Sequence, residues 1–141
     1  MDYSEWEARI PERFRRDPLW RMRVYRLASF VATESWDDAA RLARCKVTVR
    51  VSAQLYKAIG SISADISEGY SRSGGRDRAR FFEYALGSVR ETRDWYLRAL
   101  PVLGEERVFA VLDVLEEIIR MLLAIIPRER ENDQRPRDEP S

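Results

Sequence analysis

The sequence contains no histidine and a single cysteine among its 141 residues. Without an imidazole, the Ser-His and Cys-His pairs of nucleophilic enzymes and the Glu-x-x-His ligand sets of helical di-iron proteins are excluded. Cys45 has no intrachain disulfide partner, and one thiol does not make a zinc site. The sequence therefore predicts a protein that is not an enzyme and that uses no metal or cofactor.

Long apolar runs are also missing. The nearest, residues 118–126, is interrupted by Arg120 and falls short of the roughly 18 residues that span a bilayer. The first fourteen residues lack the apolar core of a secretory signal, and a single cysteine fits a reducing compartment. We therefore expect a cytoplasmic protein without a membrane partner.

What the sequence does have is helical periodicity, with apolar residues recurring at intervals of three and four. A chain of this length suits one domain, which buries roughly two-thirds of its unfolded surface. We predict an all-α fold, an antiparallel up-down four-helix bundle over residues 17–127. An N-terminal arm over residues 1–16, interrupted by Pro11, precedes the bundle and packs on a neighbour. A disordered charged tail over residues 128–141 follows it.

Start and stop signals divide the bundle. Asp17 and Pro18 mark the start of the first helix, which is predicted to end near Thr33. Ser35, followed by two aspartates, gives a second start signal and predicts a separate short helix over residues 36–44. The next helix runs from residue 47 to a glycine turn at residues 71–75. The last two are predicted over residues 76–100 and 105–127, each stopped by a proline.

The last predicted helix is apolar around most of its circumference. Eight residues between positions 108 and 126 already supply a stripe that faces the core. Four more apolar residues widen this surface, and the spare side most simply faces another subunit. The alternative is a thick core closed by the N-terminal arm. The predicted subunit contacts are Phe109, Val114, Met121 and Ile125.

The net charge of +1 conceals an uneven distribution of basic residues. Residues 9–57 hold twelve Lys or Arg against five Asp or Glu, and residues 72–98 hold seven against four. Because the guanidinium group suits phosphate, this excess favours RNA or DNA bound through its backbone. The alternative is that the arginines only solvate amphipathic helices. The candidate nucleic-acid-binding residues are Arg41, Arg44, Lys46, Arg50 and Lys57, with a second group of Arg72, Arg76, Arg78 and Arg80.

A motif surrounds the glycine turn. It consists of a Ser-Ile-x-x-x-Ile-x-Glu-Gly-aromatic helix end, a short basic loop, an Arg-Phe pair and an Ala-Leu-Gly-Ser-x-x-Glu run. This pattern resembles the four helix bundle protein family, whose members are encoded in intervening sequences of bacterial large-subunit ribosomal RNA genes. The family is related to the accessory variability determinant of diversity-generating retroelements. The residues that carry the resemblance are Ser61, Ile62, Ile66, Glu68, Gly69, Tyr70, Arg72, Arg80, Phe81, Ala85, Leu86, Gly87, Ser88 and Glu91.

The resemblance implies a helical bundle that assembles as a cyclic homopentamer and binds nucleic acid. Its motif residues Glu68, Gly69, Gly87, Ser88 and Glu91 are expected to be structural. Gly69 is expected to permit a close approach at the helix end, and Glu68 to pair with a basic group such as Arg72 or Arg80.

Our principal hypothesis is a non-catalytic, oligomeric bundle that binds RNA or DNA as an accessory to a retroelement reverse transcriptase. The alternative is a structural scaffold or protein-interaction module without nucleic-acid binding.

Overall fold

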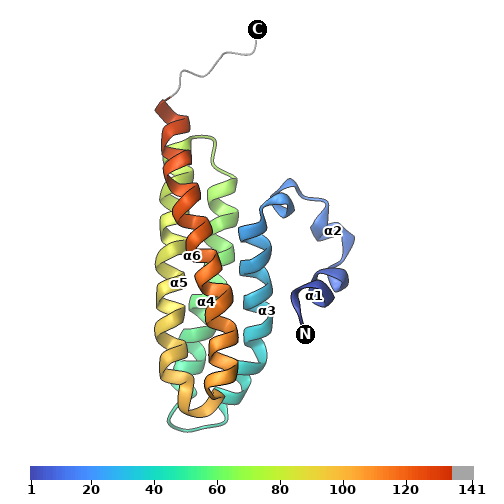
Figure 1. Ribbon diagram of the computed structural model, residues 1–141, viewed down its shortest axis with the longest axis vertical. Helices are drawn as coiled ribbons and strands as arrows, with labels where there is room; N and C mark the ends of the chain where they lie inside the picture. The colour runs from blue at the N-terminus through green and yellow to red at the C-terminus, as the bar shows by residue number, and fades with distance from the viewer. Residues whose placement is uncertain (135–141) are drawn as a thin grey trace.

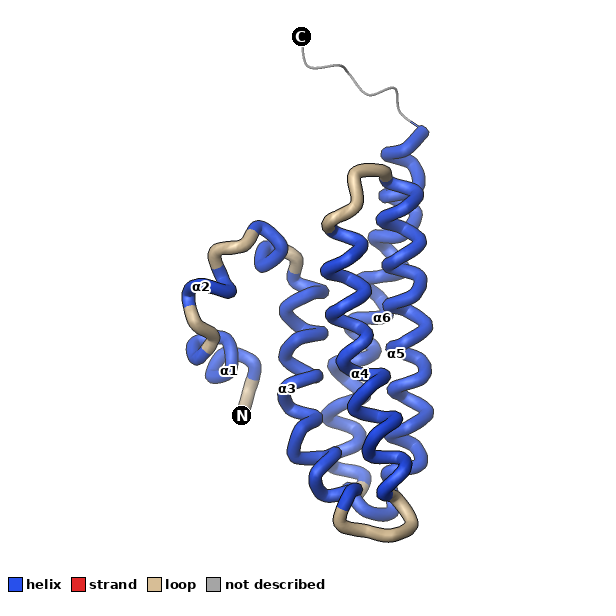
Figure 2. The backbone as a smooth tube through the Cα atoms, turned by 180° about the vertical axis from the view of Figure 1, so that it is seen from behind, coloured by secondary structure: helices blue, strands red, loops and turns tan. Residues whose placement is uncertain are grey.

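Four long helices lie side by side in the computed structural model, which describes residues 1–134 (Figure 1). The connections between consecutive helices lie alternately at the two ends of the bundle (Figure 2). No strand occurs in the described residues, so the all-α prediction is confirmed. The four helices are α3 (Arg23–Ala43), α4 (Val49–Tyr70), α5 (Gly75–Leu103) and α6 (Glu105–Gln134).

The core consists of the apolar stripes that the periodicity predicted. On α4, Leu55, Ile59, Ile62 and Ile66 are completely buried. Burying one such side chain contributes about 1.5–3 kcal/mol. Val47 is an exception at 87% exposed, because it lies in the α3–α4 connection and not within the helix. The other buried stripes are Val24, Leu27, Ala28 and Val31 of α3, Phe82, Ala85, Val89 and Tyr96 of α5, and Val108, Val111, Leu115, Ile118, Leu122 and Ile126 of α6.

The N-terminal arm folds into two short helices, α1 (Tyr3–Arg9) and α2 (Glu12–Arg15), and a 3-10 turn, η1 (Pro18–Arg21). Pro11 is the N-cap residue of α2 and separates α1 from α2. Proline is tolerated at the start of a helix but interrupts a helix interior. Trp6 is buried, with its ring 5.8 Å from that of Trp20 and 5.5 Å from that of Phe30 on α3. The arm therefore packs on α3 of its own chain (Figure 1).

The predicted separate helix over residues 36–44 does not exist, because α3 runs unbroken from Arg23 to Ala43. Ser35 is buried, and its hydroxyl donates a hydrogen bond to the Ala32 carbonyl at 2.6 Å. The hydroxyl is therefore used within the helix and does not cap a new one. The first predicted start is displaced as well. Asp17 accepts a hydrogen bond from the backbone N–H of Leu19 at 2.9 Å and so caps η1.

Neither predicted stop at a proline is correct. Helix α5 passes Pro101 and ends before Gly104, whose φ of +83° is readily adopted only by glycine. Helix α6 passes Pro127 and continues to Gln134. Residues 128–134 of the tail that we predicted to be disordered are therefore helical, and residues 135–141 lie outside the described residues.

Contacts with the start of α5 explain why α6 continues beyond Pro127. A proline inside a helix costs about 3 kcal/mol. Beyond it, Glu129 accepts a hydrogen bond from Arg78 Nε at 2.6 Å, and Asp133 accepts one from the Gly75 backbone N–H at 2.7 Å. A Cβ atom on Gly75 would collide with the Glu129 carbonyl. Glycine at this position therefore allows the two helices to meet.

Candidate nucleic-acid interface

The α3–α4 connection, residues 44–48, has a path fixed by two buried hydroxyl groups. Thr48 Oγ1 donates a hydrogen bond to the Leu42 carbonyl at 2.8 Å, and Ser52 Oγ donates one to the Ala39 carbonyl at 2.7 Å. Leu42 is in the last turn of α3, and its carbonyl accepts the Thr48 hydroxyl in addition to the Cys45 backbone N–H. The connection and the first turns of α4 are thereby held in a defined position.

This end of the molecule carries the α3–α4 basic group, which is Arg41, Arg44, Lys46, Arg50 and Lys57, all of them exposed. Arg41 donates a hydrogen bond to the Val102 carbonyl near the end of α5 at 2.9 Å. The other four form no ion pair with any side chain in residues 1–134. Their charge is therefore available to an external anion.

The α4–α5 arginine group, Arg72, Arg76, Arg78 and Arg80, is instead engaged within the chain. Arg78 is the most enclosed, at 23% exposed, and bonds to Glu129 as well as to the carbonyls of Arg72 and Ser73 in the turn. Arg76 and Arg78 therefore link the glycine turn and the start of α5 to α6, whereas Arg72 and Arg80 pair within the turn and α5. The remaining ion pairs are Arg72–Asp77 at 3.9 Å, Arg76–Asp133 at 3.9 Å and Arg80–Asp77 at 2.7 Å.

The α3–α4 connection and the glycine turn between α4 and α5, from which the two basic groups extend, lie at opposite ends of the bundle (Figures 1 and 2). Their nearest members along the chain, Lys57 on α4 and Arg72 just beyond its end, are fifteen residues apart, which is about 22 Å at 1.5 Å per residue. They are therefore two distinct surfaces, and only the α3–α4 basic group is largely unpaired.

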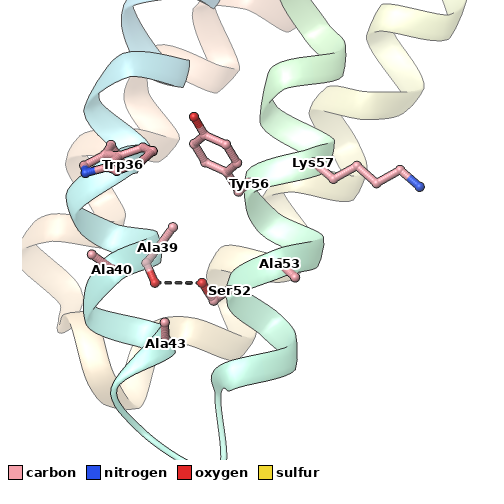
Figure 3. A pocket seen from close by; sticks show the side chains of 8 residues that line it. All are labelled: Trp36, Ala39, Ala40, Ala43, Ser52, Ala53, Tyr56 and Lys57. Carbon is pink, nitrogen blue, oxygen red and sulfur yellow. Dashed lines mark hydrogen bonds between the residues drawn. The ribbon is translucent and has the colours of Figure 1, made fainter.

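An apolar groove between α3 and α4 lies beside the α3–α4 basic group (Figure 3). Its volume is about 420 Å³, and Trp36 and Tyr56 stand at one end of it, 64% and 46% exposed. Their ring centroids are 5.8 Å apart and the rings are inclined at 76°. The groove was not predicted from the sequence, although Trp36 and three alanines recur at helical spacing outside the core stripe. The other lining residues are Ala39, Ala40, Ala43, Ser52, Ala53 and Lys57.

The two motif residues at the end of α4 differ in their contacts. Gly69 is buried, and a Cβ atom there would lie 2.7 Å from Cε1 of Phe82, so glycine permits a close approach of α5. Glu68 is exposed and forms no ion pair in the described part of the chain, because Arg72 and Arg80 both pair with Asp77. The expected pairing of Glu68 with either arginine was wrong.

Of the motif residues on α5, Ser88 lies next to α4. Ser88 Oγ is 3.5 Å from Asp65 Oδ2, at the limit of a hydrogen bond. Burial raises the pKa of Asp65, the negative charge of Glu68 raises it further, and the Ser88 hydroxyl opposes both. Gly87 would have no atom within 4 Å of an added Cβ, and Glu91 is exposed. Neither residue has an internal packing role.

Of the predicted subunit contacts on α6, Val114, Met121 and Ile125 share one side of the helix, at spacings of seven and four residues, and Phe109 lies on another. Phe109 is 54% exposed and lines a groove on the α5 side together with Leu97, which is 65% exposed. Val114 lines a small pocket on the opposite side with Val31 of α3. Met121 and Ile125 are half-buried and packed against the core. Only Phe109 thus remains largely open.

A buried polar network joins α3, α5 and α6, and sequence reasoning missed it. Asp38, 3% exposed, accepts hydrogen bonds from the Tyr96 hydroxyl at 2.7 Å and from Arg107 Nε and Nη2, each at 2.9 Å. We had interpreted Asp38 as part of a helix start. The signal was its place in the core stripe of α3, seven residues after Val31 and four before Leu42. A paired, buried carboxylate of this kind has a structural role.

Both partners of Asp38 have shifted pKa values. Burial raises the pKa of Tyr96, and the nearby Asp38 carboxylate raises it further. Burial alone would lower the pKa of Arg107, but its hydrogen bond to Asp38 and the Asp38 charge raise it overall. The network therefore holds a protonated phenol and a charged guanidinium around one carboxylate.

The pKa of Cys45 is lowered, first by a hydrogen bond from the Val47 backbone N–H to its sulfur and then by hydrogen bonds from the side chain and backbone of Thr48.

Within residues 1–134, no three or more Cys, Asp or Glu side chains gather where they could hold a metal ion. None of the described helices combines the length and the apolarity that crossing a membrane requires.

Residues 21–124 match the family model described as 23S rRNA-intervening sequence protein. This range includes all four long helices except the end of α6 and leaves out most of the arm. Neither a curated protein nor a solved structure matches the chain.

Proposed function

Because the chain belongs to the 23S rRNA-intervening sequence protein family, we propose that it is a non-catalytic, oligomeric, antiparallel four-helix bundle that binds RNA or DNA. The observation that carries this proposal is the α3–α4 basic group, in which four exposed cations have no ion pair in the described residues. Every member of the α4–α5 arginine group, in contrast, has an ion pair. Contact with phosphates would be independent of sequence and sensitive to salt.

Charge reversal tests this proposal. The double variant Arg50→Glu with Lys57→Glu should weaken binding to every RNA or DNA sequence by a similar factor. It should also lower the slope of log affinity against log salt concentration by about 0.7 for each lost phosphate contact on a single strand. Fluorescence anisotropy of labelled oligonucleotides over a salt series measures both quantities.

The matched control is Arg76→Glu with Arg80→Glu, which makes the same change of charge in the α4–α5 arginine group. These side chains already pair with Asp133 and Asp77, so a smaller effect on binding is expected. Circular dichroism confirms that each variant is folded. Absence of binding by the unaltered protein at low salt, or equal losses in both variants, would refute the assignment of this surface.

We propose that the protein is a homo-oligomer and, as its family resemblance implies, a ring of five. The apolar groove of α5 and α6 that holds Leu97 and Phe109 supports a subunit contact, because large exposed apolar side chains cluster there. A ring would repeat the α3–α4 basic group five times and raise avidity for a polyanion. Native mass spectrometry at micromolar concentration should return five copies, and a monomer would contradict this.

The same apolar groove favours the second candidate function, a scaffold or protein-interaction module. In that case the arginines are only solvated, and the protein binds no oligonucleotide at low salt.

If the protein does bind nucleic acid, we propose that it acts as an accessory to a retroelement reverse transcriptase. Co-purification with the reverse transcriptase of a neighbouring gene should then survive nuclease treatment. Its loss on nuclease treatment would limit the role to shared nucleic acid.

A further inference from the structure

We propose that the groove between α3 and α4 binds an unpaired nucleobase of a single-stranded nucleic acid, with the neighbouring phosphates contacting the α3–α4 basic group. The proposal rests on the nucleic-acid binding proposed above and specifies its substrate class as a single strand. It also assigns Trp36 and Tyr56 a role in binding that the sequence pattern did not suggest.

The two aromatic rings provide a surface that suits a planar partner. Trp36 and Tyr56 are 64% and 46% exposed and lie next to each other at one end of the groove, one from each helix (Figure 3). Exposing large aromatic surfaces side by side is unfavourable in water, and a base that stacks on them removes part of that surface. The alanines of both helices leave an open floor beside the rings.

The ring geometry defines how a base would stack. The two centroids are 5.8 Å apart and the planes are inclined at 76°, so the rings contact each other edge to face and leave no slot between them. A base therefore stacks on the face of one ring while it lies over the alanine floor. Ser52, the polar residue of the floor, already donates its hydroxyl proton to the Ala39 carbonyl. Few polar groups in the groove remain free to form hydrogen bonds with the edges of a base, so we expect the groove to bind different bases with similar affinity.

Charge complementarity favours a nucleic acid over a protein segment as the occupant. Lys57 lines the groove, Arg50 lies two turns earlier on α4, and Lys46 lies in the connection below it. None of the three has an ion pair in residues 1–134. One exposed acidic residue, Asp37, directly follows Trp36 in the sequence. Lys57 borders the groove, but its amino group points away from Trp36 and Tyr56 (Figure 3), so this cation lies on the outer side of α4, where the phosphates that flank a bound base would pass. In a duplex the base faces are stacked and unavailable, which selects single strands.

The test compares three probes of the same length, on the order of 12 nucleotides. They are oligothymidylate, an abasic strand with the same phosphates, and a duplex. The unaltered protein should bind oligothymidylate about 5- to 150-fold more tightly than the abasic strand, the range for stacking one base. Trp36→Ala and Tyr56→Ala should each remove most of this difference and leave affinity for the abasic strand within about twofold, since phosphate contacts remain.

The matched control is Tyr84→Ala, which removes a side chain on α5 that is 52% exposed and far from the groove in sequence. It should keep the preference for bases. Equal binding of oligothymidylate and the abasic strand by the unaltered protein would overturn the base site and leave the proposed function standing. No binding of any probe at low salt would overturn both. A change of oligomeric state in Trp36→Ala, with unchanged affinity, would identify the groove as a subunit contact and would also overturn the base site.

Discussion

Asp38 connects three helices of the bundle, because it lies on α3 and bonds to α5 through Tyr96 and to α6 through Arg107. Replacing it with alanine leaves a buried hydroxyl and a half-buried guanidinium without their carboxylate. We expect Asp38→Ala to lower the free energy of unfolding by about 3–5 kcal/mol in urea denaturation.

The control for this prediction removes both charges. Asp38→Leu combined with Arg107→Met replaces the ion pair with apolar side chains, which is often neutral for stability. The double variant should therefore be clearly more stable than Asp38→Ala. If the two variants were equally unstable, the cause would be lost packing or the Tyr96 hydroxyl, which both variants leave without its acceptor, and not the unpaired guanidinium.

Tyr96 makes stability depend on pH at the alkaline end. Burial and the Asp38 charge raise its pKa in the folded protein, whereas a tyrosine in the unfolded chain ionises near pH 10. Above about pH 10 only the unfolded state releases this proton, so stability falls by up to about 1.4 kcal/mol per pH unit. Below that pH the contribution is fully present. Urea midpoints between about pH 9 and about pH 11 should decline more steeply for the unaltered protein than for Tyr96→Phe. Parallel declines would contradict this.

Replacing Gly69 or Gly87 of the motif with alanine should have opposite effects on the stability of the protein. Gly69→Ala places a methyl group 2.7 Å from Cε1 of the buried Phe82 and should cost about 1–3 kcal/mol of stability. Gly87→Ala meets nothing within 4 Å and should gain up to about 1 kcal/mol, because alanine is the better helix former. Thermal and urea unfolding measure both. Destabilisation by Gly87→Ala would indicate that another molecule packs closely there.

At the scale of the element, a side chain near the end of α6 caps the start of α5. Helix α5 has no side-chain cap from its own N-cap residue, Gly74, and Asp133 of α6 accepts the Gly75 N–H in its place. Asp133→Ala should therefore cost about 0.5–2 kcal/mol, as the loss of a helix cap does. Glu131→Ala, an exposed carboxylate on the same turn, is the matched control and should change stability little. Equal effects would show that Asp133 does not cap α5.

At the scale of the whole molecule, assembly should be visible as a dependence of stability on concentration. If subunits meet through the groove of Leu97 and Phe109, the midpoint of thermal unfolding rises with protein concentration. Leu97→Glu with Phe109→Glu should abolish this rise and return a smaller species in light scattering. Tyr84→Glu, which alters a similarly exposed side chain elsewhere on α5, should leave the assembly intact. A concentration-independent midpoint in the unaltered protein would refute the contact.

The sequence by itself determined the helical class and most of the core. Residues such as Leu55, Ile59 and Ile66 recur at the spacing of one helix face, and burial of that face is the main favourable term in folding. The sequence also located both basic groups, because charge is visible without coordinates. It did not locate the helix ends at Pro101 and Pro127, since proline weakens a helix locally while packing decides whether the helix continues.

Only the tertiary structure decided which polar groups meet. Asp38 and Arg107 are 69 residues apart, and no local pattern indicates that they form a pair. The same holds for the two basic groups, which look alike in sequence. The arginines at the glycine turn are neutralised by carboxylates, two of them on α6, whereas those of the α3–α4 connection find no such partner among residues 1–134. Ion pairing depends on distances of a few ångströms, and the packing of the helices sets those distances.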